Sequence, residues 1–256
     1  MRSLRSLIRL LILLETAVEY CVRFSTRRVR ARLSLEERAE WLHESCRAGL
    51  RRLNISVHAR GAFPRHGLLI SNHLSYLDIL VYSSLSPCVF VSKKEVRSWP
   101  IFGQMACMAG TVFIDRSRSA DARRVNSEML EALSKGAVVV LFPEGTSSDG
   151  STVLPFRPAL FEAAVEAGEP VTPAHLRYDV ADGSPGNDVC YWGTMTFFPH
   201  LLRLLSKKGI RAAIHFAPEA TMFEDRKLAA KQMHELVLEL GQLNSSRGSR
   251  ANRASG

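Results

Sequence analysis

A histidine and an aspartate stand five positions apart, directly behind a short apolar run, and together they could transfer a proton. The run is Leu68–Ile70, the histidine is His73 and the aspartate is Asp78. A buried strand over the run would end just before the imidazole, and the carboxylate would lie in the first turn of the helix that follows. A carboxylate placed there can bond one ring nitrogen, which fixes the tautomer and stabilises the cation formed when the other nitrogen accepts a proton. The pair therefore predicts a general base with its orienting acid.

The same residues also fit a purely structural interpretation, a histidine in a surface turn and an aspartate that favours a helix N-terminus. Ser75 is predicted to be the N-cap of that helix, and it is the rival candidate for a nucleophile. The chain contains no Gly-x-Ser-x-Gly sequence, the turn that exposes a nucleophilic serine in many hydrolases. We therefore expect a base to assist attack by a substrate, without a covalent intermediate on Ser75.

Three later apolar runs also end in residues that could bind or orient a substrate. The first ends in Asp115-Arg116, the second continues into the Phe-Pro-Glu-Gly-Thr segment 142–146, and the third is Val171–Pro173. In an open α/β sheet, ligands bind beyond the carboxyl ends of the strands. The histidine, the arginine and the glutamate are therefore predicted to converge on one cleft.

With both the His-x4-Asp block and the Phe-Pro-Glu-Gly-Thr block, the chain resembles the glycerolipid acyltransferase family from about Trp41 to about Glu219. Bacterial members include the 1-acylglycerol-3-phosphate acyltransferases. The resemblance implies transfer of a fatty acyl group from a thioester, acyl-CoA or acyl carrier protein, to a lysolipid hydroxyl, by default that of 1-acylglycerol-3-phosphate. It implies no cofactor and no metal.

The resemblance and the residue types together assign roles to the candidate site. His73 and Asp78 are the predicted catalytic pair, and a guanidinium can hold a phosphate through two hydrogen bonds. The predicted acceptor-binding or loop-ordering residues are Arg116, Glu144, Gly145 and Thr146. For Arg116 the alternative is a structural ion pair, and for Glu144 a structural hydrogen bond. Backbone N–H groups after Glu144, or a lysine such as Lys94, could stabilise the oxyanion, and Asn72 and Ser75 could shape the site.

One departure from the family pattern concerns the acceptor. Phosphate-accepting members often carry an arginine after Phe-Pro-Glu-Gly-Thr, whereas this chain has Ser147-Ser148-Asp149-Gly150. In this respect it resembles the variants that acylate lyso-ornithine lipids or other lysolipids. Arg157 is the candidate that could supply the missing charge.

The composition is that of a globular protein with an anionic partner. The 256 residues carry a net charge of +9, and 46% are hydrophobic and 23% charged. Five scattered cysteines suit buried thiols in a reducing compartment better than a disulfide framework. The N-terminal basic residues are Arg2, Arg5, Arg9, Arg23, Arg27, Arg28, Arg30 and Arg32. A nucleic-acid binder usually interleaves such charge with exposed aromatics or a recognisable module, whereas here the charge flanks apolar helix, which favours phospholipid head groups. A basic membrane-binding protein without activity is the alternative from another functional class.

The N-terminal segment has the pattern of a helix that lies in a membrane interface. Apolar residues recur at helical spacing from Leu4 to Cys21, but Glu15 and Glu19 interrupt the run, and spanning needs roughly 20 apolar residues. A single transmembrane anchor and a soluble packing helix are the alternatives. Ser34 with Glu37 predicts a capping box that opens a second helix. We expect a membrane-associated hairpin over 1–53, an acyltransferase domain over 54–243, a disordered tail over 244–256, and location at the cytoplasmic face of the inner membrane.

Alternating strand and helix patterns predict a single α/β domain with a mixed sheet and helices on both faces. The predicted strands are 55–59, 68–71, 88–91, 111–114, 137–142, 171–177 and 210–217. The predicted helices are 75–85, 99–108, 120–135, 158–167, 197–207 and 224–240.

Overall fold

A seven-stranded sheet forms the centre of the computed structural model, which describes residues 2–30, 32–99, 101–115 and 119–253. Each predicted strand is present, with bounds that differ by a few residues. The strands are β1 (Ile55–Arg60), β2 (Gly67–Ser71), β3 (Val89–Lys93), β4 (Val112–Ile114), β5 (Val138–Leu141), β6 (Val171–Val180) and β7 (Ile210–Phe216). The central strands β2 and β5 are buried along their whole length, as expected of strands covered on both faces.

The sheet is mixed, as predicted. The strand order is β1-β7-β6-β2-β5-β3-β4, and neighbours are parallel except for the antiparallel pair β6 and β7. Strands β2, β3, β4 and β5 therefore end at the same edge of the sheet. The segments that follow them contain His73, Lys94, Asp115 and Glu144, so the predicted convergence of the polar clusters follows from the topology.

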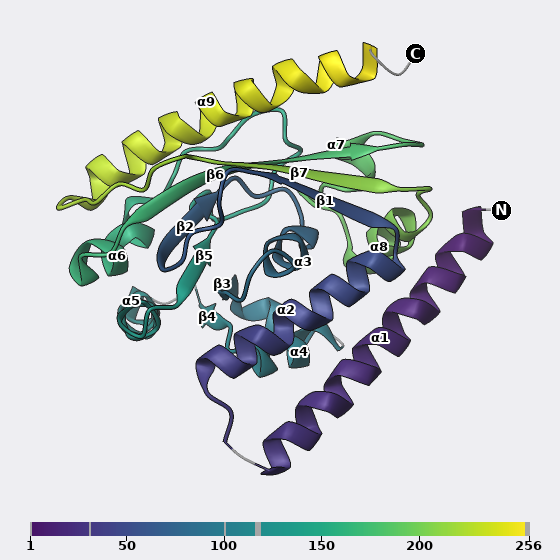
Figure 1. Ribbon diagram of the computed structural model, residues 1–256, viewed down its shortest axis with the longest axis horizontal. Coiled ribbons are helices and arrows are strands. Elements are labelled where there is room, and N and C mark those ends of the chain that lie inside the picture. Colours follow the sequence, from purple (N-terminus) through teal and green to yellow (C-terminus); the bar gives the residue numbers. More distant parts are fainter. Residues whose placement is uncertain (1, 31, 100, 116–118, 254–256) are drawn as a thin grey trace.

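Helices cover both faces of the sheet (Figure 1). On one face, α2 (Leu35–Arg52), α3 (Leu77–Ser83) and α8 (Phe197–Leu205) share a core with the sheet that includes Trp41, Tyr82 and Phe90. On the other face, α5 (Ser119–Ser134), α6 (Glu162–Ala167) and α9 (Arg226–Arg253) build a second core around Leu133 and Met233. The remaining helices are α4 (Phe102–Met108), α7 (Pro185–Asp188) and the 3-10 turns η1 (Lys94–Ser98) and η2 (Pro158–Phe161).

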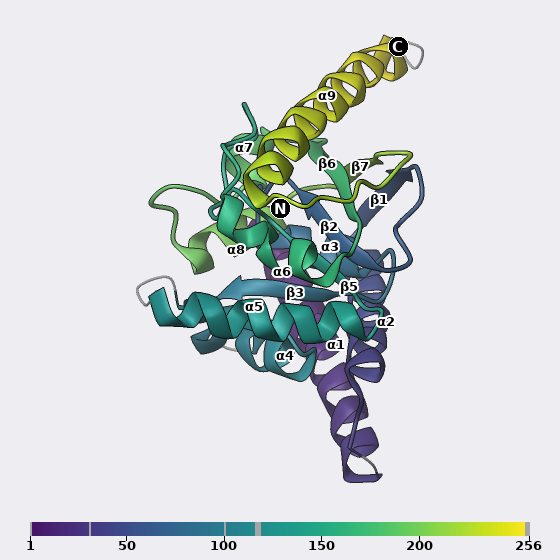
Figure 2. The ribbon, with the colours of Figure 1, turned by 90° about the vertical axis from the view of Figure 1, so that its left-hand side faces the viewer.

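The first two helices pack against each other as a hairpin, and one end of it projects from the body of the protein (Figure 2). They are α1 (Arg2–Arg30) and α2, which opens with the predicted capping box at Ser34. The Trp41 indole N–H donates to the carbonyl of Tyr20 at 2.8 Å, and the Trp41 ring meets Phe24 edge-on. Within the described part of the chain, no helix is both long enough and apolar enough to cross a bilayer.

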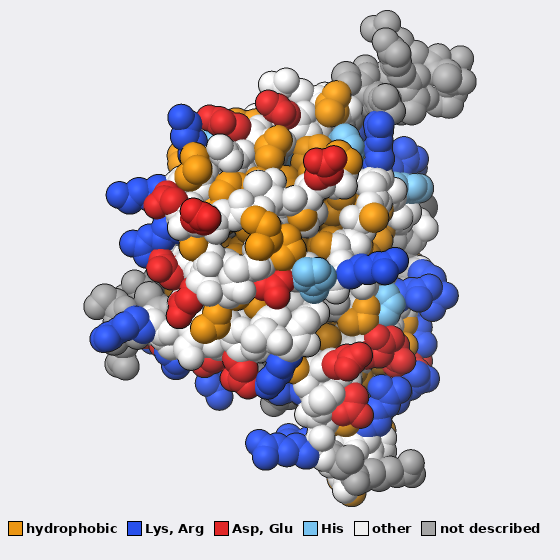
Figure 3. Space-filling view, turned by 60° about the vertical axis from the view of Figure 1, so that its left-hand side comes forward, with side chains coloured by type: hydrophobic (Ala, Val, Ile, Leu, Met, Phe, Trp, Pro, Cys, Tyr) orange, Lys and Arg blue, Asp and Glu red, His pale blue; other side chains and the backbone are white. Residues whose placement is uncertain are grey.

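The N-terminal residues Arg5 and Arg9 bind backbone carbonyls elsewhere in the chain. Arg5 donates to the carbonyl of Ser206 at 2.8 Å. Arg9 donates to the carbonyl of Lys208 at 3.1 Å and to that of Lys207. Carbonyls at the C-terminus of a helix have no partner within it, and cations there are favourable. These arginines therefore fasten α1 to the end of α8. On the surface shown in Figure 3, acidic side chains are interspersed with basic ones.

Four local features differ from the sequence-based expectations. Ser75 is not an N-cap: α3 begins at Leu77, its N-cap is Tyr76, and no side chain caps it. The Ser75 hydroxyl accepts no N–H of the helix among the described residues, and its backbone N–H donates to Asp78 Oδ2 instead. The 3-10 turn η1 and the short helix α7 were not predicted. Helix α9 continues to Arg253 through the segment expected to be disordered, since extending a helix that has already formed costs little per residue.

Candidate active site

His73 and Asp78 form the predicted pair at the carboxyl end of β2. The imidazole Nδ1 donates to Asp78 Oδ2 at 2.7 Å. The Asp78 side chain is completely buried, whereas that of His73 is 22% exposed. The imidazole therefore reaches a cavity while its partner is shielded from water. The Nε2 atom makes no hydrogen bond within the described residues, which leaves it available to a substrate.

The backbone around His73 fixes the position of the carboxylate. Asp78 Oδ2 also accepts the N–H groups of Leu74 at 2.7 Å and of Ser75 at 3.0 Å. Its other oxygen accepts the hydroxyl of Tyr178 from β6 at 2.7 Å. Both oxygens of a buried carboxylate thus have partners, which is the condition for keeping such a charge in a protein interior. Sequence reasoning missed Tyr178, because 100 residues separate it from Asp78.

The other contacts of His73 come from the loop after β5. Its ring stacks on Phe142 with a centroid distance of 4.3 Å and an interplanar angle of 10°. Its carbonyl accepts the N–H of Ser148 at 2.9 Å. Its own N–H donates to Glu144 Oε1 at 2.8 Å. The Phe-Pro-Glu-Gly-Thr segment therefore fixes the position of His73 through the ring of Phe142 and the carboxylate of Glu144. The two sequence blocks thus form one site.

Glu144 lies beneath the site and faces backbone. Only 3% of the residue is exposed, and its second oxygen accepts the N–H of Leu154 at 3.1 Å. These contacts fit the loop-ordering role better than direct binding of an acceptor. Burial raises the pKa of Glu144 to about 7, although the two backbone donors oppose that shift.

The raised pKa of Glu144 predicts a pH-dependent stability. An acid that holds its proton more tightly when folded loses stability as pH rises, because the folded state binds more protons than the unfolded state. We expect the melting temperature of the wild type to fall relative to Glu144→Gln between about pH 4.5 and 7. The slope contribution is at most roughly 1.4 kcal/mol per pH unit. If the melting temperatures of the two proteins changed with pH in parallel across this window, Glu144 would not titrate there.

Gly145 and Thr146 line the cavity that His73 reaches. Gly145 has a φ of +74°, a conformation that favours glycine. A Cβ at this position would lie 2.6 Å from Nε of Arg157. The absence of a side chain therefore lets the guanidinium of Arg157 pack against the loop next to the site.

The remaining candidates divide into structural residues and residues near the cavity. Asn72 is buried, and its side chain bonds both the carbonyl and the N–H of Leu176, at 3.0 and 2.8 Å. The Ser75 hydroxyl is fully buried without a hydrogen-bond partner in the described structure, and Ser75 does not line the cavity. Lys94 pairs with Asp115 at 2.6 Å. Arg116 lies outside the described residues, so its predicted role stays a prediction.

The catalytic cavity opens at the strand ends and has a volume of about 630 Å³. His73, Phe142 and Thr146 line one part of it, and Tyr191 and Trp192 from the loop before α8 line another. Glu95 and Asp115 also border it, so acidic groups lie beside the cationic residue Lys93. The His73 imidazole is thus open to a cavity with polar groups in its lining.

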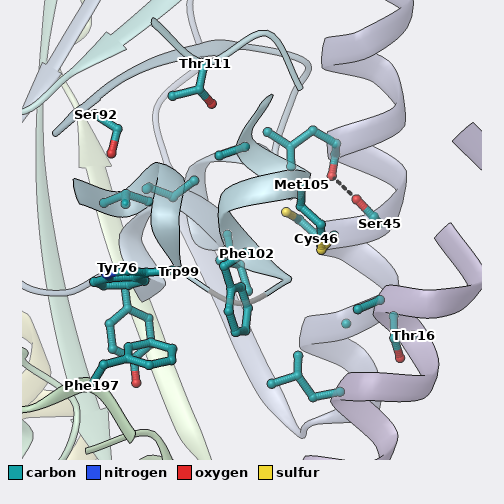
Figure 4. A pocket seen from close by; sticks show the side chains of 18 residues that line it. Thr16, Ser45, Cys46, Tyr76, Ser92, Trp99, Phe102, Met105, Thr111 and Phe197 are labelled. Carbon is teal, nitrogen blue, oxygen red and sulfur yellow. Dashed lines mark hydrogen bonds between the residues drawn. The ribbon is translucent and has the colours of Figure 1, made fainter. Parts of the chain in front are cut away.

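A second, apolar pocket adjoins the catalytic cavity (Figure 4). The two share Tyr76, Ile79, Ser92, Val96 and Trp99 as lining residues. From there the apolar pocket runs between α4 and the N-terminal hairpin. Its further lining includes Leu13, Ala17, Leu42, Cys46, Phe102 and Met105. A hydrocarbon chain would find almost only apolar contacts there.

Comparison with known proteins identifies the family. Residues 54–177 match the family model described as Acyltransferase. A lyso-ornithine lipid O-acyltransferase of Pseudomonas aeruginosa is 36% identical over 77% of this chain and 75% of the relative. A 1-acyl-sn-glycerol-3-phosphate acyltransferase of Neisseria meningitidis is 33% identical over 79% and 81%.

A solved structure supports the fold independently. The crystal structure of the 1-acyl-sn-glycerophosphate acyltransferase PlsC from Thermotoga maritima has a TM-score of 0.69 to this chain. The match covers 94% of this chain and 97% of that one at 21% identity. With the family model, the relatives and the two sequence blocks in agreement, this chain belongs to the acyltransferase family.

Proposed function

We propose that this protein transfers a fatty acyl group from a thioester to the hydroxyl of a lysolipid. The observation that carries the proposal is the His73–Asp78 pair in a cavity that continues into an apolar pocket. Acyl transfer to an alcohol needs a base for the hydroxyl proton, and a lipid substrate needs a place for its chain. The relatives named above act on lysolipids by name, which supports the choice of acceptor class.

The reaction proceeds in one complex without an acyl-enzyme. His73 Nε2 accepts the proton of the acceptor hydroxyl while the hydroxyl oxygen attacks the thioester carbonyl carbon. Asp78 stabilises the imidazolium through Nδ1. When the tetrahedral intermediate collapses, the carbon–sulfur bond breaks and the thiolate takes the proton from the imidazolium. The products are the acylated lipid and a free thiol, and His73 returns to its neutral state.

Backbone groups are the better candidates for stabilising the oxyanion. The ammonium of Lys94 is already paired with Asp115. Thr146 and Ser147 line the cavity beside His73, directly after the turn at Gly145. Their backbone N–H groups could face the developing negative charge, which is where preorganised donors contribute most.

The acceptor head group has two candidates. The default is 1-acylglycerol-3-phosphate, for which Arg116 and Arg157 would supply positive charge. Lyso-ornithine lipid is favoured by two observations. Ser147 stands where phosphate-accepting members often carry arginine, and its hydroxyl is bound to the carbonyl of Tyr191. Glu95 borders the cavity, where a carboxylate suits the ammonium of a zwitterionic head group better than a phosphate, whereas Asp115 there is paired with Lys94.

The test is an assay of the purified protein with acyl-CoA or acyl carrier protein as donor, at several chain lengths. The acceptors are 1-acylglycerol-3-phosphate, lyso-ornithine lipid and an alcohol without a lipid chain. We expect transfer to a lysolipid and none to the simple alcohol. Preference for one lysolipid selects the head group. Failure to acylate any lysolipid with either donor would overturn the proposal.

We also propose that α1 lies in the membrane interface, at the cytoplasmic face where thioester donors occur. The support is a row of large apolar side chains on its outer surface, turned away from the protein. Their exposed fractions are 62% for Leu4, 54% for Leu7, 58% for Leu11, 60% for Val18 and 57% for Val22. Water is an unfavourable environment for such a row.

Polar replacement of this row is expected to weaken membrane binding. In the Leu7→Gln/Leu11→Gln double variant, two side chains worth roughly 1.5–3 kcal/mol each on burial are lost. Binding to anionic vesicles should fall by about tenfold or more in a sedimentation assay. Ser3→Gln/Ser25→Gln, at exposed positions of the same helix, is the matched control and should bind normally. Equal binding by both variants would contradict the interfacial role of the row.

A further inference from the structure

Tyr178 lies beneath the His73–Asp78 pair and is almost fully buried. The residue is 2% exposed, and its hydroxyl donates to Asp78 Oδ1 at 2.7 Å. Burial, with the nearby carboxylate, raises the pKa of Tyr178 well above its usual value. The hydroxyl therefore keeps its proton and remains a donor throughout any practical assay.

The pairing of β2 with β6, extended by the side chain of Asn72, places Tyr178 next to Asp78. Strands β2 and β6 pair as far as Ser71 and Ala174, after which the chain of β2 turns away toward His73. The side chain of Asn72 then bonds both backbone groups of Leu176, so the contact between the two strands continues past the end of β2. Two residues further along β6, Tyr178 projects from the same face of the strand as Leu176 and meets Asp78.

We propose that Tyr178 is a positioning residue for acyl transfer, which acts on His73 by holding the carboxylate of Asp78. This inference rests on the proposed role of His73 as general base. Without the tyrosine hydroxyl, Oδ1 of a fully buried carboxylate has no partner among the groups described. Burying a charged oxygen without a donor is costly, so the carboxylate is no longer held in one position and the His73 imidazole bonded to Oδ2 loses its fixed orientation.

The hydroxyl also sets how strongly Asp78 attracts a proton on His73. A donor on Oδ1 draws negative charge away from Oδ2, the atom that bonds Nδ1. The other titratable groups around the carboxylate are Glu144, Tyr82 and Cys190. The Tyr82 hydroxyl donates to Ser71 Oγ at 2.6 Å and not to Asp78. Among the described residues, neither Glu144 nor Cys190 forms a hydrogen bond with Asp78. Tyr178 is therefore the side chain that donates a hydrogen bond to Oδ1.

The test compares Tyr178→Phe with Tyr82→Phe. Both tyrosines are buried and each loses one hydroxyl hydrogen bond, but only one of the bonds reaches Asp78. We expect Tyr178→Phe to lower kcat by about 10- to 100-fold with little change in either KM. The acidic limb of its kcat/KM–pH profile should move to higher pH, because the imidazolium is better stabilised. Tyr82→Phe should change the melting temperature but neither kinetic property.

Two further measurements separate positioning from folding. In an Asp78→Asn background, Tyr178→Phe should cause little additional loss, since the carboxylate through which the tyrosine acts is gone. If Tyr178→Phe does not fold, 3-fluorotyrosine at position 178 replaces it. The more acidic hydroxyl should move the acidic limb to lower pH, and the same substitution at position 82 should not.

Near-normal kcat with an unmoved pH profile in folded Tyr178→Phe would overturn the inference, as would equal effects of the two variants. If 3-fluorotyrosine at position 178 left the acidic limb of the kcat/KM–pH profile unmoved, that result would overturn the inference as well. Failure of the proposed function has a different signature. In that case His73→Ala itself retains turnover, whereas failure of this inference alone leaves His73→Ala inactive and Tyr178→Phe active.

Discussion

Replacing His73 by alanine is expected to reduce acyl transfer by roughly 10²- to 10⁴-fold, the usual contribution of a general base, while the protein stays folded. The ring lies at the cavity with 22% of its side chain exposed, so its removal leaves no large void in the core. The Asp78 carboxylate keeps its bonds to two backbone N–H groups and to Tyr178. The measurement is the single-turnover rate at saturating donor, with circular dichroism to confirm folding.

His66→Ala is the matched control for this experiment. The His66 Nδ1 atom also bonds a carboxylate, that of Glu169 at 2.8 Å, but it does so at the surface and outside the cavity. The control should retain normal turnover. Near-normal turnover by His73→Ala would refute the base mechanism. An acyl group trapped on Ser75 would refute the direct mechanism, and the buried position of that hydroxyl argues against such an adduct.

Asp78→Asn is expected to cause a loss of similar size, roughly 10²- to 10⁴-fold. An amide oxygen can still accept some of the hydrogen bonds that the turn and Tyr178 offer, so the fold is disturbed less than by alanine. The amide carries no charge, however, and it does not stabilise the imidazolium that forms as the hydroxyl loses its proton. The loss should therefore appear in kcat, with acceptor and donor KM nearly unchanged.

Glu169→Gln serves as the control for the charge change, because it removes the carboxylate of the surface pair. Its turnover should match the wild type. If Asp78→Asn kept normal kcat and bound substrate weakly instead, the carboxylate would be a substrate-binding group rather than the partner of the base. The two outcomes are separated by measuring both kinetic constants for each substrate.

The sequence alone determined the parts of this protein that depend on neighbours along the chain. The His73–Asp78 contact lies within one turn, so the spacing of the two residues was enough to predict it. Short apolar runs predicted the strands, most plainly the central β2 and β5, because a strand buried on both faces has no polar side to interrupt the pattern. The capping box at Ser34 is also local, and the structure confirms it.

Some local expectations differ from the structure. Ser75 has the residue type of an N-cap, yet α3 begins two residues later, at Leu77, and the Ser75 hydroxyl bonds no described group. The N-terminal arginines were expected to face lipid, but Arg5 and Arg9 bind the carbonyls at the end of α8. In both cases the residue type allows the predicted interaction, but the fold places the side chain elsewhere.

Only the tertiary structure decided what supports the His73–Asp78 pair and which side chains line the apolar pocket. Glu144 reaches the N–H of His73 across 71 residues, and Tyr178 reaches Asp78 across 100. The apolar pocket combines side chains from α1, α2, α4 and α8. Such contacts depend on strand order, register and helix placement, which are set by the packing of the whole chain. A sequence pattern records which residues can bond or pack, but the partner of each is fixed only when distant segments are brought together.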